Sequence, residues 1–135
     1  MRFVFIAARL LLGLMFFVFG LNGFLFFIPA PAHIPGAAGA FAGAMFTSHF
    51  MWFTSGVQLI CGIMLLTNQY VPLALVMLGA VLSNILVFHM TMWPASPSTP
   101  MALIATALWV VACWPLRSYF APLFARTVAP QQEIR

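Results

Sequence analysis

The sequence predicts an all-α membrane protein: a bundle of four transmembrane helices with a short interfacial helix between the first and second spans. The first observation is composition, because 64% of the 135 residues are hydrophobic and 4% are charged, which leaves too little polar surface to cover a soluble core. The second is segmentation, because the apolar runs at residues 10–28, 49–66, 71–90 and 101–116 contain no Asp, Glu, Lys or Arg. Soluble enzymes and nucleic-acid-binding domains are thereby excluded.

The first span, residues 10–28, follows Arg2 and Arg9. At about 1.5 Å per residue it is long enough to cross a hydrocarbon core about 30 Å thick. A basic start before an apolar run is also compatible with a signal peptide, but this run is longer than the usual apolar stretch of about 7–15 residues. Residues 29–48 are rich in Pro, Gly and Ala and form a connector, in which we expect a short interfacial helix at residues 36–46.

The second and third spans, residues 49–66 and 71–90, form a helical hairpin, because the link between them is too short for any arrangement except antiparallel neighbours. Residues 91–100 are rich in Pro and Ser and form a loop before the fourth span, residues 101–116. The long side chain of Arg117 can reach the headgroups from the end of that span. Residues 118–126 are predicted to be interfacial, so a single transmembrane domain covers residues 1–126, and residues 127–135 form a polar tail.

The charges predict the orientation of the bundle. The five basic residues lie near the two chain ends, and they are Arg2, Arg9, Arg117, Arg126 and Arg135. The predicted loops between the spans contain no Lys or Arg, so the positive-inside rule places both termini in the cytoplasm. The aromatic residues Trp52 and Trp93 then lie at the outer interface, with Tyr70 and Tyr119 at the inner one.

A polar layer in the outer half of the bundle is the candidate site. Counting the rise along each helix places Asn22, Gln58 and Asn84 in the outer half, with His89 at the outer end of the third span. Small and polar residues spaced by three and four form stripes that we expect to face inward, because amides exposed to lipid cost several kcal/mol. The stripes are Gly13 and Gly20 on the first span, Ser55, Gln58, Cys61 and Gly62 on the second, and Gly79, Ala80, Ser83 and Asn84 on the third.

Three interpretations of this layer remain open at this stage. Amides in membrane bundles commonly form hydrogen bonds between helices, worth about 0.6–2 kcal/mol each. Alternatively, the layer lines a pocket in which these residues bind the polar head of a quinone, a lipid or another amphiphile. The third interpretation, metal or haem ligation by His49 and His89, lacks a third ligand or a carboxylate, so no metal site is predicted.

Catalysis by the side chains of this chain is not expected. The spans carry no Asp or Glu that could serve as a general acid or base, and only a histidine titrates near neutral pH. Cys61 and Cys113 lie in apolar runs and form no C-x-x-C motif, so we interpret both as small buried apolar residues. His33, in the Pro-rich connector, is interpreted as solvated.

Several short motifs occur in a characteristic order over about residues 5–115. They are Arg9-x-x-x-Gly13, Phe19-Gly20-Leu21-Asn22-Gly23-Phe24, Gly56-Val57-Gln58-x-x-x-Gly62, Pro72-Leu73 and Asn84-Ile85-Leu86-x-Phe88-His89. In this respect the chain resembles the DoxX family of small four-helix membrane proteins. The resemblance implies a four-helix bundle with an outer segment after the first span and an association with membrane redox systems, including thiosulfate:quinone oxidoreductase. Family members often carry Lys where this chain has Asn22-Gly23, and Glu where it has Gln58, so this chain lacks that intramembrane charge pair.

These inferences together predict a non-catalytic accessory subunit of a larger complex in a bacterial inner membrane. Its partners are the lipid bilayer and other membrane subunits, and nucleic acid is not among them. The alternative is a quinone-linked subunit of an oxidoreductase, with quinone or lipid as the candidate ligand. A small-molecule carrier is a third class, although a four-helix protomer would need to oligomerise to form a path.

Overall fold

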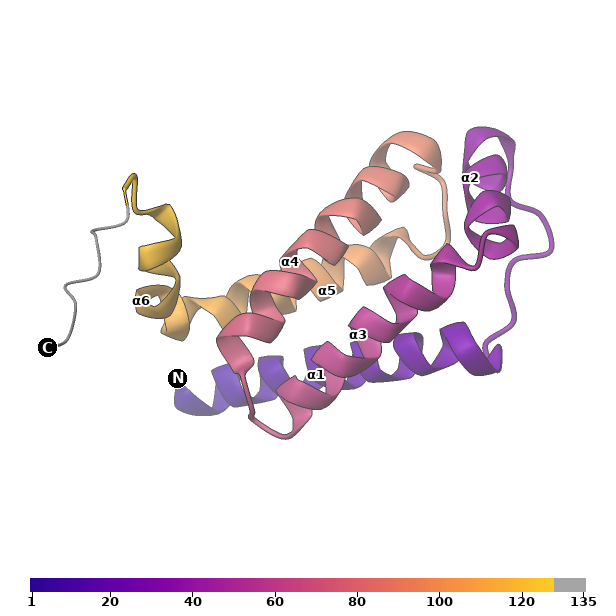
Figure 1. Ribbon diagram of the computed structural model, residues 1–135. Coiled ribbons are helices and arrows are strands. Elements are labelled where there is room, and N and C mark those ends of the chain that lie inside the picture. Colours follow the sequence, from indigo (N-terminus) through magenta and orange to yellow (C-terminus); the bar gives the residue numbers. More distant parts are fainter. Residues whose placement is uncertain (128–135) are drawn as a thin grey trace, which may run out of the picture.

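The computed structural model describes residues 1–127, which are largely helical and contain no β-strand. Five longer helices follow one another along the chain (Figure 1). They are α1 (Arg2–Leu25), α2 (Gly36–Thr47), α3 (Phe50–Leu66), α4 (Val71–Val87) and α5 (Thr99–Cys113). A π-helix at Phe88–Met92 extends α4, and α5 is followed by a 3-10 turn at Trp114–Leu116, the short α6 at Arg117–Phe120 and a second 3-10 turn at Ala121–Phe124. The predicted all-helical fold is confirmed for these residues.

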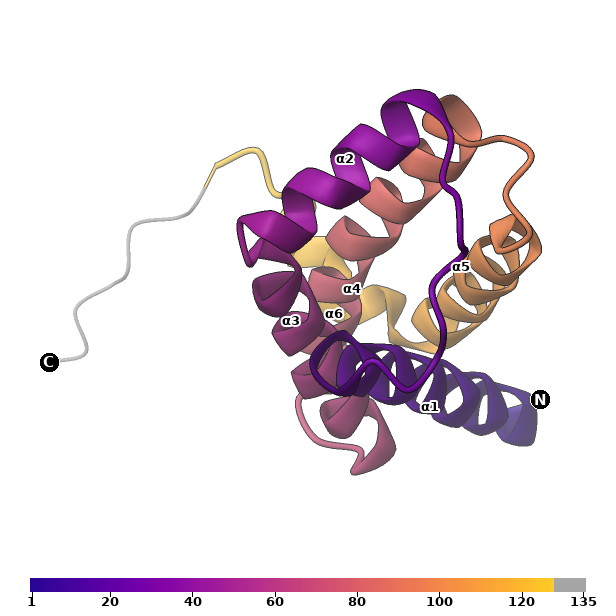
Figure 2. The same cartoon turned by 90° about the vertical axis from the view of Figure 1, so that its right-hand side faces the viewer.

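Four of the helices form a closed ring. α1 packs against α3 and α5, and α4 packs against the same two helices. The start of α1, the link between α3 and α4, and the end of α5 lie together at one end of the bundle, whereas α2 lies at the opposite end (Figure 1). Figure 2 looks onto that second end, where α2 lies across the ends of α3 and of the π-helix that extends α4. We call the end with α2 the outer end and the other the inner end.

Three helical stretches of residues 1–127 are long and apolar enough to cross a membrane, namely Arg2–Leu25, Val71–Met92 and Thr99–Phe124. α3 meets the same criteria only together with α2, from which it is bent by 84°. The bend is centred on His49, which has a left-handed backbone with φ of 59° and precedes the first residue of α3. The structure therefore contains three helices that could span a membrane, or four if α2 and α3 are counted as one broken span.

The helix that contains most of the predicted first span, residues 10–28, has other bounds than this apolar run. The helix begins at Arg2 and ends at Leu25, because Phe26 adopts a left-handed conformation and its N–H donates to the Asn22 carbonyl. The Asn22 side-chain oxygen also accepts a hydrogen bond of 2.6 Å from the Ile28 N–H. Hydrophobicity continues past this point, so it did not reveal where the helix ends.

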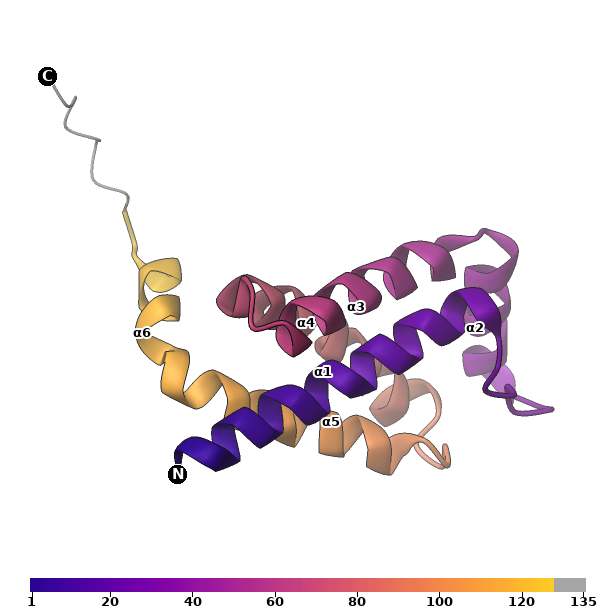
Figure 3. The ribbon, with the colours of Figure 1, turned by 90° about the horizontal axis from the view of Figure 1, so that it is seen from below.

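The other predicted elements lie close to the observed ones. The short helix expected at residues 36–46 is α2, and the hairpin is α3 and α4. The loop expected at residues 91–100 is shorter than predicted, because the π-helix continues to Met92 and α5 starts at Thr99. The segment after Arg117, predicted to be interfacial, turns away from the axis of α5 (Figures 1 and 3). Of the polar tail at residues 127–135, residues 128–135 lie outside the described part of the chain.

The contact between α1 and α3 is made through small residues. Gly13, Gly20 and Gly23 of α1 are buried against the stripe on α3 that contains Ser55 and Gly62. A Cβ atom on Gly20 would lie 2.5 Å from the backbone nitrogen of Leu59, and one on Gly62 would lie 2.6 Å from that of Phe17. The glycines therefore let the two backbones approach more closely than any side chain permits, and the two stripes face inward as predicted.

Of the stripe predicted on α4, Gly79 packs on Trp109 of α5, but the prediction that Ala80, Ser83 and Asn84 face inward was wrong. α4 buries Ala74, Leu75, Leu78 and Leu82, whereas Ser83 and Asn84 are exposed. The Ser83 hydroxyl donates to the Gly79 carbonyl at 2.8 Å, and the Asn84 amide donates to the Ala80 carbonyl at 3.1 Å. Because the preceding turn of their own helix accepts these hydrogen bonds, neither side chain requires a partner on another helix.

Candidate functional site

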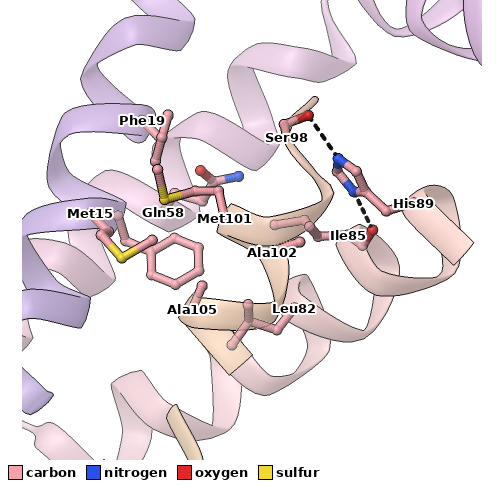
Figure 4. Close-up of a pocket in the computed structure, with 11 residues that line it drawn as sticks. Met15, Phe19, Gln58, Leu82, Ile85, His89, Ser98, Met101, Ala102 and Ala105 are labelled. Carbon is pink, nitrogen blue, oxygen red and sulfur yellow. Dashed lines mark hydrogen bonds between the residues drawn. The ribbon is translucent and has the colours of Figure 1, made fainter. Parts of the chain in front are cut away.

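A cavity of about 240 Å³ lies among the four bundle helices toward the outer end (Figure 4). Its walls come from α1, α3, α4 and α5, from the π-helix, and from the residue just before α5. Most of the lining is aliphatic or aromatic. The lining residues are Met15, Phe16, Phe19, Gln58, Leu82, Ile85, His89, Ser98, Met101, Ala102 and Ala105. The cavity is thus an apolar chamber with a few polar groups on its wall.

Gln58 contributes an amide to the cavity from the middle of α3. It belongs to the stripe predicted on α3, of which Ser55 and Gly62 pack on α1, and its side chain is half-buried. Within residues 1–127 no hydrogen bond joins the Gln58 amide to another residue, in contrast to the amides of Asn22 and Asn84. Burying an amide in apolar surroundings costs free energy unless a hydrogen-bond partner satisfies it. Gln58 is therefore the polar group best placed to bind a ligand.

His89 is held at the outer end of the cavity by two hydrogen bonds (Figure 4). Its Nδ1 lies 2.8 Å from the Ile85 carbonyl, which only accepts, so Nδ1 carries the proton. In the neutral ring Nε2 then accepts from the Ser98 hydroxyl at 3.0 Å, and the Ser98 oxygen lies 2.7 Å from the Ser96 hydroxyl. These bonds join the end of α4 to the start of α5 and fix the orientation of the imidazole.

A π-helix at Phe88–Met92 contains His89 and ends the helix that begins with α4. Its wider turn is closed by the Trp93 N–H donating to the Phe88 carbonyl at 3.1 Å, one residue farther along the chain than in an α-helix. Such turns shift the register of the side chains and occur frequently at functional sites. His89 itself keeps the α-helical spacing from Leu82 and Ile85, so ordinary helix periodicity places it on the same face as these two lining residues.

The cavity opens between α1 and α5. Phe19 of α1 and Met101 of α5 both line it, yet their side chains are 39% and 44% exposed, respectively. Figure 4 shows these two side chains on the same side of the cavity as Gln58. A ligand could therefore enter from the side of the bundle, and both flanking side chains can adopt several rotamers.

The structure divides the predicted polar layer into two parts. Gln58 and His89 line the same cavity, whereas Asn22 and Asn84 do not. Asn22 binds the backbone of the connector just after α1, and Asn84 lies on the exposed face of α4. Of the interpretations given above, hydrogen bonding explains Asn22 and Asn84, but through local bonds and not through bonds between helices.

The other histidines lie outside this cavity. His49 is exposed and packs edge-on against Trp52, with 4.8 Å between the ring centroids, and His33 is exposed in the connector. Among residues 1–127 no group of three or more His, Cys, Asp or Glu side chains lies close enough to hold a metal ion. The pairing of His49 with His89 considered from the sequence is therefore not supported by a ligand set in this part of the chain.

Sequence reasoning missed most of the cavity wall. Ser98 was assigned to a loop, and Met101, Ala102 and Ala105 were assigned only to the fourth span. One signal was present, because Ala102 and Ala105 are small residues at a spacing of three on one face of a helix. Small side chains on an inward face leave a cavity unless the neighbouring helix packs closer. At Ala102 and Ala105 of α5 the cavity remains.

Comparison of the chain with protein-family models, with curated proteins and with solved structures gave no match. The resemblance to the DoxX family therefore remains a prediction from the sequence motifs.

Proposed function

We propose that this chain is a small four-helix membrane protein of the DoxX type, a non-catalytic subunit that holds an amphiphile of the quinone class in its outer-end cavity. The observation that carries the proposal is the chemistry of the cavity. An apolar wall surrounds one amide without a partner among the described residues, Gln58, and one oriented imidazole, His89. Quinones match this pattern because an apolar ring carries carbonyl groups that accept hydrogen bonds.

The size of the cavity supports a ligand with one ring. A cavity of about 150 Å³ in another protein is large enough to hold benzene. The present volume of about 240 Å³ leaves room for substituents on such a ring. The ring would lie between Gln58 and the His89–Ser98 pair, and an isoprenoid or alkyl tail would leave between Phe19 and Met101. In a bilayer this opening faces the hydrocarbon, where the tail is most stable.

Membrane placement is supported by the long apolar helices and by the charges. The start of α1 and the end of α5 lie at the inner end, where α1 carries Arg2 and Arg9 and the segment after α5 carries Arg117, whereas the connectors at the outer end carry no Lys or Arg. We therefore place the inner end at the cytoplasmic face of a bacterial inner membrane, with the ligand cavity in the outer leaflet.

The role as a subunit of a larger complex is supported by the first turns of α1. The Arg9 guanidinium donates to the side-chain oxygen of Asn68 in the link between α3 and α4, so the residues before Arg9 extend beyond that contact. Phe3, Val4 and Ile6 in this extension are exposed. The only acidic residue in the sequence is Glu133, so groups that transfer protons or electrons would have to come from a partner subunit or from the ligand.

Purification in mild detergent tests the subunit role. A chain that purified as a lone monomer, with nothing bound, would contradict this role.

The experiment that tests the ligand compares two amide substitutions of the same chemistry. The purified protein in lipid nanodiscs is titrated calorimetrically with a decyl-substituted benzoquinone. Loss of one hydrogen bond predicts that Gln58→Leu weakens binding about tenfold, whereas Asn84→Leu leaves binding unchanged because Asn84 lies outside the cavity. Circular dichroism checks that both variants retain their helices. Absence of binding to the unmodified protein, or equal binding by both variants, would contradict the proposal.

A further inference from the structure

A second recess lies at the inner end, remote from the quinone cavity. After α5 the chain turns through Trp114–Leu116, α6 and Ala121–Phe124 (Figures 1 and 3). A groove of about 320 Å³ lies between this turn and the last turns of α5. Every lining residue except one is apolar. The lining residues are Trp109, Val110, Cys113, Trp114, Arg117, Phe120, Ala121 and Phe124.

Arg117 is the single charged group of this groove. Its guanidinium carbon lies 5.8 Å from the centre of the Trp114 ring, and one of its N–H groups donates to the Trp114 carbonyl at 3.1 Å. A guanidinium has five N–H donors in a planar arrangement suited to carboxylate or phosphate, so several remain available. Residues 1–127 contain no carboxylate side chain that could neutralise it.

We propose that this groove binds an anionic phospholipid, with the phosphate on Arg117 and an acyl chain along the aromatic wall formed by Trp109, Phe120 and Phe124. The proposal rests on the membrane placement given above, but not on the quinone. Charge complementarity identifies the ligand, because a cation beside an apolar groove matches an anion with a long apolar chain. A free phosphate would use only Arg117, and a zwitterionic lipid would place a second cation beside it.

The location of the groove agrees with this assignment. Arg2 starts α1, Arg9 donates to Asn68 in the link between α3 and α4, and Arg117 starts α6 just after α5, so these three arginines give the inner end a positive field. In the proposed orientation this end faces the cytoplasmic leaflet, where anionic lipids attract basic residues. The turn after α5 thereby positions Arg117 at headgroup depth while its aromatic neighbours remain in contact with acyl chains.

Fluorescence quenching by brominated lipids tests the site. The double variant Trp52→Phe and Trp93→Phe leaves Trp109 and Trp114, both in the groove, as the reporters. The protein is reconstituted into mixtures with either phosphatidylglycerol or phosphatidylcholine carrying bromine on the acyl chains. One arginine near an anionic lipid headgroup contributes about 1 kcal/mol. We therefore expect phosphatidylglycerol to occupy the groove about fivefold more favourably than phosphatidylcholine.

Matched variants separate the site from diffuse charge attraction. Arg117→Gln is expected to remove most of the preference for phosphatidylglycerol, Arg117→Lys to retain most of it, and Arg126→Gln, outside the groove, to leave it unchanged. Ala121→Phe fills the groove without altering any charge and should also remove the preference. Ala125→Phe, which lies just outside the lining, is its control.

The results that would overturn the proposal are distinct from those that bear on the membrane placement. Equal quenching by the two lipids, or equal effects of Arg117→Gln and Arg126→Gln, would overturn the lipid site. Quenching by neither lipid would show that the chain does not lie in the bilayer, and would therefore overturn the membrane placement as well.

Discussion

α1 packs against its two neighbours in opposite ways. Toward α3 it presents glycines, and a Cβ atom on Gly20 or Gly23 would clash with the backbone of α3 or with the side chain of Ser55. Toward α5 it presents Met15 and Phe19, which border an open cavity together with Met101 and the small side chains of Ala102 and Ala105. One helix therefore takes part both in a close contact between backbones and in the wall of the outer-end cavity.

This difference separates the part of the molecule that holds the fold from the part proposed to bind a ligand. In a membrane, helices associate through close packing and not through burial away from water, so we expect the close contact between α1 and α3 to contribute strongly to stability. The α4–α5 contact is held at a second point, where the Trp109 indole donates to the Leu75 carbonyl at 2.7 Å and its ring packs on Gly79. With both pairs fixed, α1 and α5 can remain apart at the outer end.

The largest expected effect on stability comes from a substitution in the close contact between α1 and α3. Gly20→Leu should lower the free energy of unfolding by about 3 kcal/mol or more, because the added side chain meets backbone atoms that cannot move without separating the helices. The measurement is the loss of circular dichroism during titration with a denaturing detergent.

The matched control is Gly43→Leu on α2, where a Cβ atom meets nothing within 4 Å. This control should leave stability unchanged or raise it by up to about 1 kcal/mol, because glycine is a poor helix former. Equal destabilisation by the two substitutions would show that the α1–α3 contact does not hold the bundle together.

A substitution in the cavity between α1 and α5 should change stability less but should strongly weaken quinone binding. Ala105→Leu places a larger side chain into the cavity and should change the free energy of unfolding by less than about 1 kcal/mol. Binding of the decyl benzoquinone should fall at least tenfold, because the ring and the new side chain compete for the same space. If the Ala105→Leu variant remained folded and bound the quinone with unchanged affinity, the cavity would not be the binding site.

The sequence was sufficient to predict the inward helix face where small residues recur on one side of a helix. The glycines of α1 and the small residues of α3 occur at helical spacing, and the structure packs them together. α4 offered no such signal, because apolar residues surround it on every side and periodicity then identifies no face. The inference that Asn84 points inward was wrong for this reason, and because its own helix satisfies its amide.

The candidate site was only partly predictable. Gln58 and His89 were noticed because polar side chains are rare in apolar helices. Asn22 was noticed for the same reason, yet it binds the connector after α1, an interaction that depends on where the helix ends. The space between α1 and α5 depends on how far apart the helices lie, and no single residue type encodes that distance.

The most direct test of the central claim is photolabelling. An azido-substituted benzoquinone with a decyl tail is activated on the protein in nanodiscs, and the labelled residues are identified by mass spectrometry. The proposed site predicts labels on Met15, Gln58, Met101 and neighbouring cavity residues, which an excess of unlabelled quinone abolishes. Labels confined to exposed side chains such as Leu73 and Ile104, unaffected by that excess, would contradict it.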